Sequence, residues 1–483
     1  MRYLLLTVCA LHILSPSAAR ADMLLYSLPG TKRAVVLQGK VVVNPGRTVT
    51  LRHFKFGELH FGLKDVEFHR VPTTRSLANR RKQKAVRDQD VDACIDAARW
   101  ALHHGLLSEF YAAAKAAWKI DSKHPTLRRL AVLKKKMDAT LPASTTQEQE
   151  MRTYVTTGRH MEFVRSKHFL LMHNTSSEKN GARKTRAEDR LQLLETVYAS
   201  FLLKFCLEGC ELDIPTEHLK VVLFADKRDY LDFGRVLKNP SLSKASGFYA
   251  MKENVAVFFD HGTDEDYKTL ARLSKKLQAT KDQAIKRRVR GIKEFARFAN
   301  TLQLLIQVSR ENSDIEVVSH EATHQLAANT GLMPNDAPVP LWVAEGLATY
   351  FESPKQAAWS GIGAVNKDRL ESYRTLARDE EKSNLEVVVT DKIFMNAGDH
   401  ASSLYAYGQA WALTHFLMDR HFDKLIKYYQ LLAKKRADKL LSADKNQEIF
   451  EMVFGDIEEN LDIEWRAYRR SLRTDLERVL DER

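Results

Sequence analysis

The pentapeptide His320-Glu321-Ala322-Thr323-His324 constrains this chain more than any other stretch, because it reads H-E-x-x-H. On an α-helix the residues at i and i+4 lie on one face, so both imidazoles can point at one metal ion. Glu321 follows the first histidine, where its carboxylate can take a proton from a water molecule. Zinc in a hydrolytic site takes three protein ligands and keeps one position open. The motif therefore predicts a helix and requires a third ligand from elsewhere.

Residues 340–352, with the sequence PLWVAEGLATYFE, supply the candidate third ligand. Glu345 follows His324 after 20 intervening residues, which leaves room for a loop and the start of a second helix. A carboxylate beside two imidazoles completes a three-ligand set for zinc. We therefore expect one zinc ion bound by His320, His324 and Glu345, with Glu321 as the general base.

Residues 342–352 resemble the W-x-x-E-G-x-A-x-Y-x-E segment of gluzincin metallopeptidases, a group that includes thermolysin-like enzymes and related aminopeptidases. The resemblance implies an α+β fold, in which a mixed sheet precedes the helices that carry H-E-x-x-H. It implies a zinc-dependent peptidase that hydrolyses peptide bonds. It also implies a downstream tyrosine that donates to the oxyanion formed in the reaction. Tyr407 is the first candidate for that donor, followed by Tyr405 and His415.

The same resemblance raises a question about what supports the ligands. Thermolysin-like enzymes place an aspartate one turn after the glutamate ligand, and Thr349 stands in that place here. A threonine is the weaker partner for a ligand histidine. Glu352 is expected to contribute nothing to metal binding.

The segment L-W-x-x-E-G-L-A-x-Y and residues 407–411 (YGQAW) also resemble an uncharacterised group of secreted bacterial proteins with a gluzincin-like domain of unknown function. That resemblance implies a metallopeptidase acting on a peptide or protein and names no particular substrate. The competing interpretation is a catalytically inactive, peptidase-like protein that binds a surface partner. The intact H-E-x-x-H motif and Glu345 favour the enzyme, because a relic has no reason to keep the base.

The N-terminus reads as an export signal. Arg2 precedes an apolar run over residues 3–14 that is too short to span a bilayer, and Ala19-Arg20-Ala21 is typical of a cleavage site. We expect residues 1–21 to be removed and the mature chain to begin at Asp22. No later stretch approaches transmembrane length, so the expected location is secreted, periplasmic or at the cell surface.

The rest of the chain, which has 483 residues in all, is long enough for more than one domain. Short β-branched runs separated by Gly and Asn-Pro-Gly predict strands in the first part, and helical periodicity with an alanine-rich, tetratricopeptide-like helix pair follows. The predicted segments are a β-rich subdomain (22–73), a helical segment (74–140), a linker (141–150) and a peptidase domain (151–483) with a basic helical insertion (263–299).

Three local patterns carry further expectations. Ser313-x-x-Glu316 is a capping box, which predicts that the helix bearing H-E-x-x-H begins there, and Gly331 is its natural stop. Residues 250–254 are expected to form a turn at the tip of a hairpin at the sheet edge. Cys206 and Cys210 either close a short disulfide or remain two reduced thiols.

The chain carries a net charge of +13. Such a charge attracts an exported protein to anionic surfaces, including cell-surface polymers and lipid headgroups, whereas no motif supports nucleic-acid binding. The basic insertion either presents a solvated face, docks an acidic partner or partly covers the cleft. Tyr407, Trp411 and His415 share one helix face, which either packs in the core or lines the site.

Overall fold

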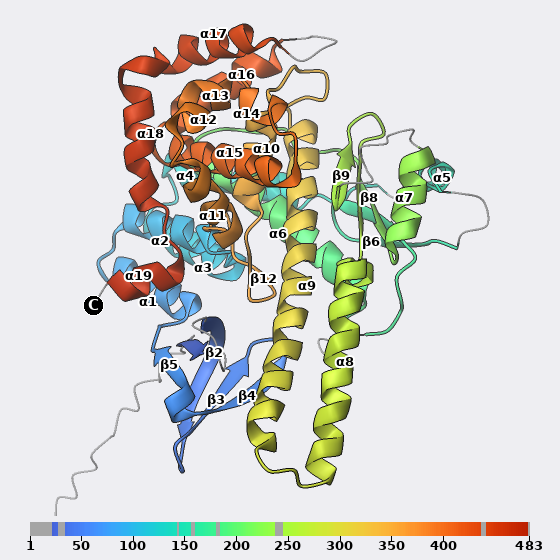
Figure 1. Ribbon diagram of the computed structural model, residues 1–483. Helices are drawn as coiled ribbons and strands as arrows, with labels where there is room; N and C mark the ends of the chain where they lie inside the picture. Colours follow the sequence, from blue (N-terminus) through green and yellow to red (C-terminus); the bar gives the residue numbers. More distant parts are fainter. Residues whose placement is uncertain are drawn as a thin grey trace, which may run out of the picture. The chain divides into compact units, whose positions relative to one another are not determined.

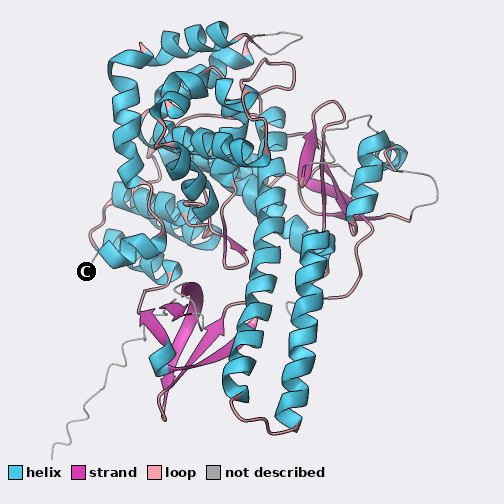
Figure 2. Ribbon diagram, in the orientation of Figure 1, coloured by secondary structure: helices cyan, strands magenta, loops and turns pink. Residues whose placement is uncertain are grey.

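The structure is a computed structural model in which residues 22–27, 34–142, 144–155, 160–179, 184–236, 245–435 and 441–481 are described. The chain divides between Arg80 and Arg81 into two compact units. Figure 2 shows helices together with strands, which confirms the expected α+β class. The expected signal segment lies outside the described residues. Cys94, Cys206 and Cys210 are free thiols. Of the two alternatives for Cys206 and Cys210, the structure therefore has two reduced thiols and no disulfide between them.

The first unit is built on a five-stranded antiparallel sheet. The strands predicted from its β-branched runs are confirmed, and they lie in the order β4-β3-β2-β1-β5. Leu24, Leu37 and Leu51 are buried on it. A β-carbon at Gly39 would lie 2.3 Å from the carbonyl oxygen of Arg52, so the pairing requires glycine there. The elements are β1 (Asp22–Ser27), β2 (Ala34–Asn44), β3 (Thr48–His53), β4 (Gly57–Gly62), the 3-10 turn η1 (Leu63–Asp65) and β5 (Val66–His69).

A run of helices follows, and the division between the units falls within the first of them, α1 (Thr74–Arg87). The predicted helix pair is confirmed as α2 (Val91–His103) and α3 (Leu107–Ile120), which separate at Gly105 with φ of 68°. Its side chains also contact the following region, since Arg99 Nε donates to Glu208 Oε1 at 3.1 Å. Next come α4 (Pro125–Met137) and α5 (Thr145–Thr153).

The second unit contains a mixed sheet, with strand order β6-β7-β8-β10-β9. The three inner strands are parallel to one another, and β6 and β9 are antiparallel edges, so the predicted edge hairpin is confirmed. One face packs Leu170, Val222 and Val257 against Tyr230 of α7. The elements are β6 (Glu162–Arg165), β7 (Phe169–His173), α6 (Arg186–Leu207), β8 (Leu219–Phe224), α7 (Lys227–Val236), β9 (Gly247–Ala250) and β10 (Val255–Phe259).

Two long helices leave this sheet side by side (Figure 1). After the turn η3 (His261–Thr263), α8 spans Glu265–Lys286 and α9 spans Ile292–Asn329. The prediction that the site helix begins at Ser313 is wrong, because α9 starts far earlier. Residues 301–312 contain no Gly or Pro to interrupt it, and the Ser313 hydroxyl contacts Tyr267 of α8 at 3.0 Å. Gly331, with φ of 73°, follows its end as predicted.

The remainder of the second unit is almost entirely helical, and α15 packs against both α10 and α11. None of the helices in the described ranges combines the length and apolarity that a membrane crossing requires. The elements are α10 (Leu341–Phe351), β11 (Pro354–Lys355), β12 (Ala358–Trp359), α11 (Lys367–Leu376), α12 (Glu380–Ser383), α13 (Leu385–Val389), α14 (Lys392–Met395), α15 (His400–Arg420), α16 (Phe422–Ala433), α17 (Ala443–Phe454), the π-turn η4 (Ile457–Leu461), α18 (Asp462–Tyr468), η5 (Arg469–Ser471) and α19 (Asp475–Asp481).

Candidate metal centre

The helix α9 presents the two histidines of the H-E-x-x-H motif on one face. Their rings lie 4.8 Å apart between centroids, and His324 Nε2 is 3.1 Å from His320 Nε2. The side chains of His320 and His324 keep 12% and 18% of their surface exposed, so they remain reachable from solvent. Glu321, between them in sequence, is buried. The i, i+4 spacing thus brings the two imidazoles together as predicted.

The third candidate ligand is placed by α10, whose first turn is fixed from a distant segment. Asp391 accepts hydrogen bonds from the backbone N–H of Leu341 at 2.7 Å and of Trp342 at 2.9 Å. Gly346 lets α10 approach α15 closely, because a β-carbon there would lie 2.2 Å from Thr414 Oγ1. Glu345 is therefore held one turn into a helix that is anchored at its start and pressed against a neighbour.

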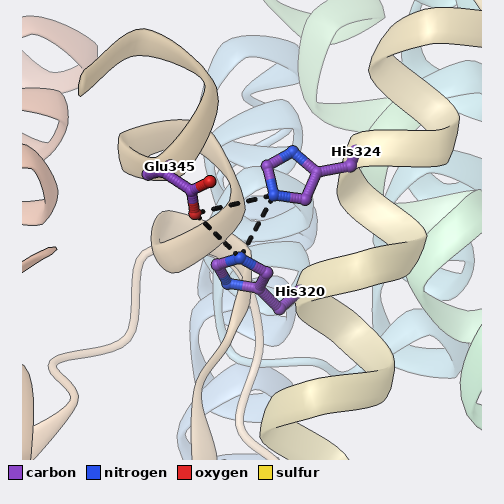
Figure 3. A group of neighbouring side chains, drawn as sticks. All are labelled: His320, His324 and Glu345. Atoms are coloured by element: carbon purple, nitrogen blue, oxygen red, sulfur yellow. Dashed lines mark hydrogen bonds and ion pairs between the residues drawn. The ribbon is translucent and has the colours of Figure 1, made fainter. Parts of the chain in front are cut away.

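The structure brings His320, His324 and Glu345 together as one cluster (Figure 3). Glu345 Oε2 is 3.1 Å from His320 Nε2 and 3.6 Å from His324 Nε2. The three ligand atoms lie within 4.8 Å of one another. Within the described parts of the chain, this is the one group of three or more His, Cys, Asp or Glu side chains arranged to hold a metal ion.

A second layer of charged side chains supports His320, and sequence reasoning missed it. His320 Nδ1 donates to Glu352 Oε2 at 2.8 Å, and Glu352 is almost fully buried. Arg369 holds the other oxygen of Glu352 through its Nε at 2.5 Å and reaches Glu316 Oε1 through Nη2 at 3.2 Å. Glu352 therefore fixes the ring of His320, a contact that the sequence did not predict for this residue.

Thr349, the weaker partner in the place where thermolysin-like enzymes have an aspartate, directs its hydroxyl to its own helix. Its hydroxyl donates to the backbone carbonyl of Glu345 at 2.7 Å, within its own helix. Glu352 lies about two turns after Glu345, and the chain leaves the helix at that point with extended backbone. The carboxylate reaches His320 from there because Arg369 of α11 draws it into place. The sequence signal that could have pointed to this contact was Glu352 itself, a second acidic residue on the segment that carries Glu345.

The electrostatics of the cluster favour a cation. Because the Glu352 carboxylate accepts from Nδ1 of His320, Nε2 is the nitrogen of this ring that faces His324 Nε2 and an oxygen of Glu345. Burial lowers the pKa of His320, but hydrogen bonds to Glu345 and Glu352 outweigh it and raise the pKa well above the usual value. Burial acts to raise the pKa of Glu345, but His324 and His320 hold it well below its usual range. The site thus attracts positive charge, and its donor set of two imidazoles and one carboxylate fits zinc.

Glu321 has a different environment from Glu345. Burial raises the pKa of its carboxyl, and the two histidines only partly oppose that shift. The edge strand β9 passes against it, since a β-carbon at Gly247 would lie 3.3 Å from Glu321 Cγ and 2.4 Å from Val317 Cγ1. A glycine at this position keeps the strand close to the site helix.

Tyr407 lies beside the cluster. Its ring centroid is 6.4 Å from that of His320, and the guanidinium of Arg369 lies 5.2 Å from the same ring. The negative charge of Glu345 and burial raise the pKa of Tyr407, so its hydroxyl remains a proton donor. Of the two further candidates, Tyr405 is half-buried on the same helix. His415 contacts Tyr350 and Trp411 in the core, where burial lowers its pKa to about 3. The helix face is therefore divided: Tyr407 reaches the cluster, and Trp411 and His415 form core.

Comparison with known proteins places these features in one stretch. Residues 314–437 match a family described as proteins of unknown function (DUF1570). That stretch contains every residue of the cluster, from His320 to Tyr407, together with Glu352 and Arg369. No curated protein matched the chain.

Proposed function

We propose that this protein is a zinc-dependent peptidase of the gluzincin type. The observation that carries the proposal is the convergence of two histidine nitrogens and one carboxylate oxygen beside a buried glutamate. The ligands would be His320, His324 and Glu345, which matches the three-ligand sets of hydrolytic zinc sites. When bound, zinc would polarise the scissile carbonyl and lower the pKa of water.

Glu321 is the residue that would move the proton. Its raised pKa makes the carboxylate a better proton acceptor near neutral pH. In the proposed reaction it takes a proton from the attacking water and returns it to the leaving amine. Glu352 keeps the proton of His320 on Nδ1, so Nε2 stays available as a ligand.

Two further elements fit a peptide substrate. The Tyr407 hydroxyl would donate to the developing oxyanion, which needs a second donor in a water-excluded site. The edge strand β9 passes against Glu321, so an extended peptide can add to that edge of the sheet through backbone hydrogen bonds. Neither role depends on the first unit.

The test is Glu321→Gln, which keeps size and hydrogen-bonding reach but cannot accept the proton. Zinc content and folding should stay the same, while hydrolysis of a broad peptide library should fall by about 10²-fold or more. The matched control is Glu294→Gln, the same change at an exposed position near the start of α9. The control should keep full activity.

Two outcomes would contradict the proposal. Equal activity of the wild type and Glu321→Gln would place the chemistry elsewhere. A wild-type protein that binds zinc and cleaves no member of the library would favour the inactive, peptidase-like binding protein.

A further inference from the structure

The helical pair α8–α9 forms a long arm, here defined as residues 265–300. Figure 1 shows the two helices running side by side to a turn between Lys286 and Ile292. Gln278 Nε2 of α8 donates to the carbonyl of Ala299 at 3.0 Å, and Lys281 Nζ donates to Asn300 Oδ1 at 3.2 Å. These contacts tie the helices together below the turn, so the arm presents its tip as an ordered surface.

Positive charge is concentrated on this arm. It holds eleven Lys or Arg against four Asp or Glu, a surplus of seven out of the net +13 of the whole chain. Nearer its base, Lys268 pairs with Glu265 at 3.0 Å and Arg272 with Glu265 at 3.6 Å. At the tip the cations have no such partners among the described residues: Lys286, Arg287, Arg288, Arg290 and Lys293. The charge of the tip is therefore available to an anionic partner.

Apolar side chains stand among these cations. Residues 285–291, with the sequence IKRRVRG, are all exposed. Ile285 is 51% exposed and Val289 is 48% exposed, and the two flank the Lys286–Arg288 run. Arg288 and Gly291 have φ of 52° and 81°, which build the tight turn that holds both aliphatic residues at the end of the arm.

This combination selects one kind of partner. A soluble polyanion would neutralise the cations but leave the aliphatic side chains in water. A bilayer that contains anionic phospholipids accepts both, because headgroups pair with the cations while aliphatic groups enter the boundary with the acyl chains. We propose that residues 285–293 dock the protein on such a bilayer. This surface is separate from the candidate metal centre. The protein would therefore dock on the bilayer in the same way whether it is a peptidase or an inactive, peptidase-like binding protein.

The experiment measures co-sedimentation of the purified protein with vesicles. Vesicles of phosphatidylcholine alone are compared with vesicles in which about a third of the lipid is phosphatidylglycerol, at low and high salt. Binding should require the anionic lipid and weaken as salt rises. Lys286→Glu combined with Arg287→Glu should lower the apparent affinity by at least about tenfold. The matched control is Lys275→Glu combined with Lys276→Glu, an equal charge change at exposed positions of α8, which should lower it by less than about threefold.

The aliphatic residues need their own pair of variants. Ile285→Ser with Val289→Ser should lower vesicle binding by about tenfold with every charge retained. Leu270→Ser with Leu273→Ser, two exposed apolar residues nearer the base of the arm, should leave it unchanged. All variants change exposed side chains and are otherwise identical in sequence. Circular dichroism checks that each is folded.

Two results would overturn the proposal. Vesicle binding that is unaffected by both tip variants would exclude the tip as the docking surface. Binding of single-stranded DNA or a soluble anionic polysaccharide that depends on Lys286 and Arg287 but not on Ile285 and Val289, without vesicle binding, would make the tip a polyanion site. Neither result depends on peptidase activity.

Discussion

Two buried clusters of charged residues lie on α9, less than two turns apart, and they are built in opposite ways. In the first, Arg186 and Arg190 of α6 pair with Glu311 and Asp314, and His261 Nδ1 lies 2.8 Å from Asp314 Oδ1. The second cluster is the candidate metal centre. Both contain buried acids and a histidine, yet only the second converges on a point where an ion fits.

The difference is one of charge balance. In the first cluster three carboxylates, those of Asp260, Glu311 and Asp314, face the three guanidinium groups of Arg186, Arg190 and Arg310. The second cluster holds one guanidinium, that of Arg369, which pairs with two of its four carboxylates, those of Glu316 and Glu352. The other two carboxylates are those of Glu321 and Glu345. A balanced cluster holds helices together. An acidic one that also holds two imidazoles retains a demand for positive charge, which zinc would meet.

The largest effect is expected in the balanced cluster. Asp314→Asn removes one charge and leaves Arg186 and Arg190 buried without it, so unfolding free energy should fall by about 3–5 kcal/mol. Urea denaturation measures this cost. The exposed change Asp282→Asn is the control and should stay within about 0.5 kcal/mol. A cost for Asp314→Asn below about 1 kcal/mol would show that the cluster does not hold α6 to α9.

Glu345→Ala should give the opposite pattern. Loss of a ligand should weaken zinc binding by more than about 10²-fold, the upper range for residues that only support ligands. The fold of the metal-free protein should be little affected, because the change reduces repulsion among carboxylates. Competition with a chelator measures the affinity, and Glu371→Ala on α11 is an exposed control. Full zinc occupancy of Glu345→Ala would remove this residue from the ligand set.

Tyr407→Phe deletes one hydroxyl at the edge of the acidic cluster. If that hydroxyl meets the oxyanion, kcat should fall by about 10²-fold with little change in KM. Steady-state kinetics on a cleaved peptide separate the two constants, and zinc content should not change. An unchanged kcat would leave Tyr407 a packing residue against Arg369 and Phe394.

Glu352→Gln tests the support of His320. The amide keeps the size of the side chain but carries no charge and can present its N–H groups to the ring. Zinc affinity should fall by about 10–100-fold, less than for Glu345→Ala. Isothermal titration of the metal-free protein gives the difference. An affinity equal to that of the wild type would show that the hydrogen bond to Glu352 does not orient the ligand.

The smallest effect concerns Asp391, a buried acid that caps α10 without an arginine. Burial raises its pKa to about 6, while the backbone N–H groups of Trp342 and Leu341 oppose that shift. The folded state then binds the proton more readily than the unfolded state, so this residue's contribution to stability is present at about pH 4 and is lost as pH rises through 6. Relative to Asp391→Asn, the wild type should lose about 1–2 kcal/mol over that interval. Parallel stability curves between pH 4 and 7 would exclude the shift.

The sequence by itself determined the three candidate ligands and most of the elements around them. A spacing of four residues on a helix places His320 and His324 on one face whatever surrounds them, so local periodicity was sufficient. The strands predicted in the first unit, the edge hairpin of the second sheet, the helix pair and the stop at Gly331 followed from equally local signals. The start of α9 did not, because the capping box at Ser313 was overridden by an uninterrupted helix packed on α8.

Only the tertiary structure decided which side chains hold the candidate ligands in place. Arg369 of α11 holds Glu352, and Asp391, just before α14, holds the first turn of α10. Each pair lies too far apart in the sequence for a local motif to connect its members. Glu352 belongs to the cluster because the chain turns out of α10 there and meets that arginine. Gly346 and Gly247 likewise have meaning only against α15 and α9. Such relations arise from packing between distant segments, whereas a spacing along one helix is a property of the backbone itself.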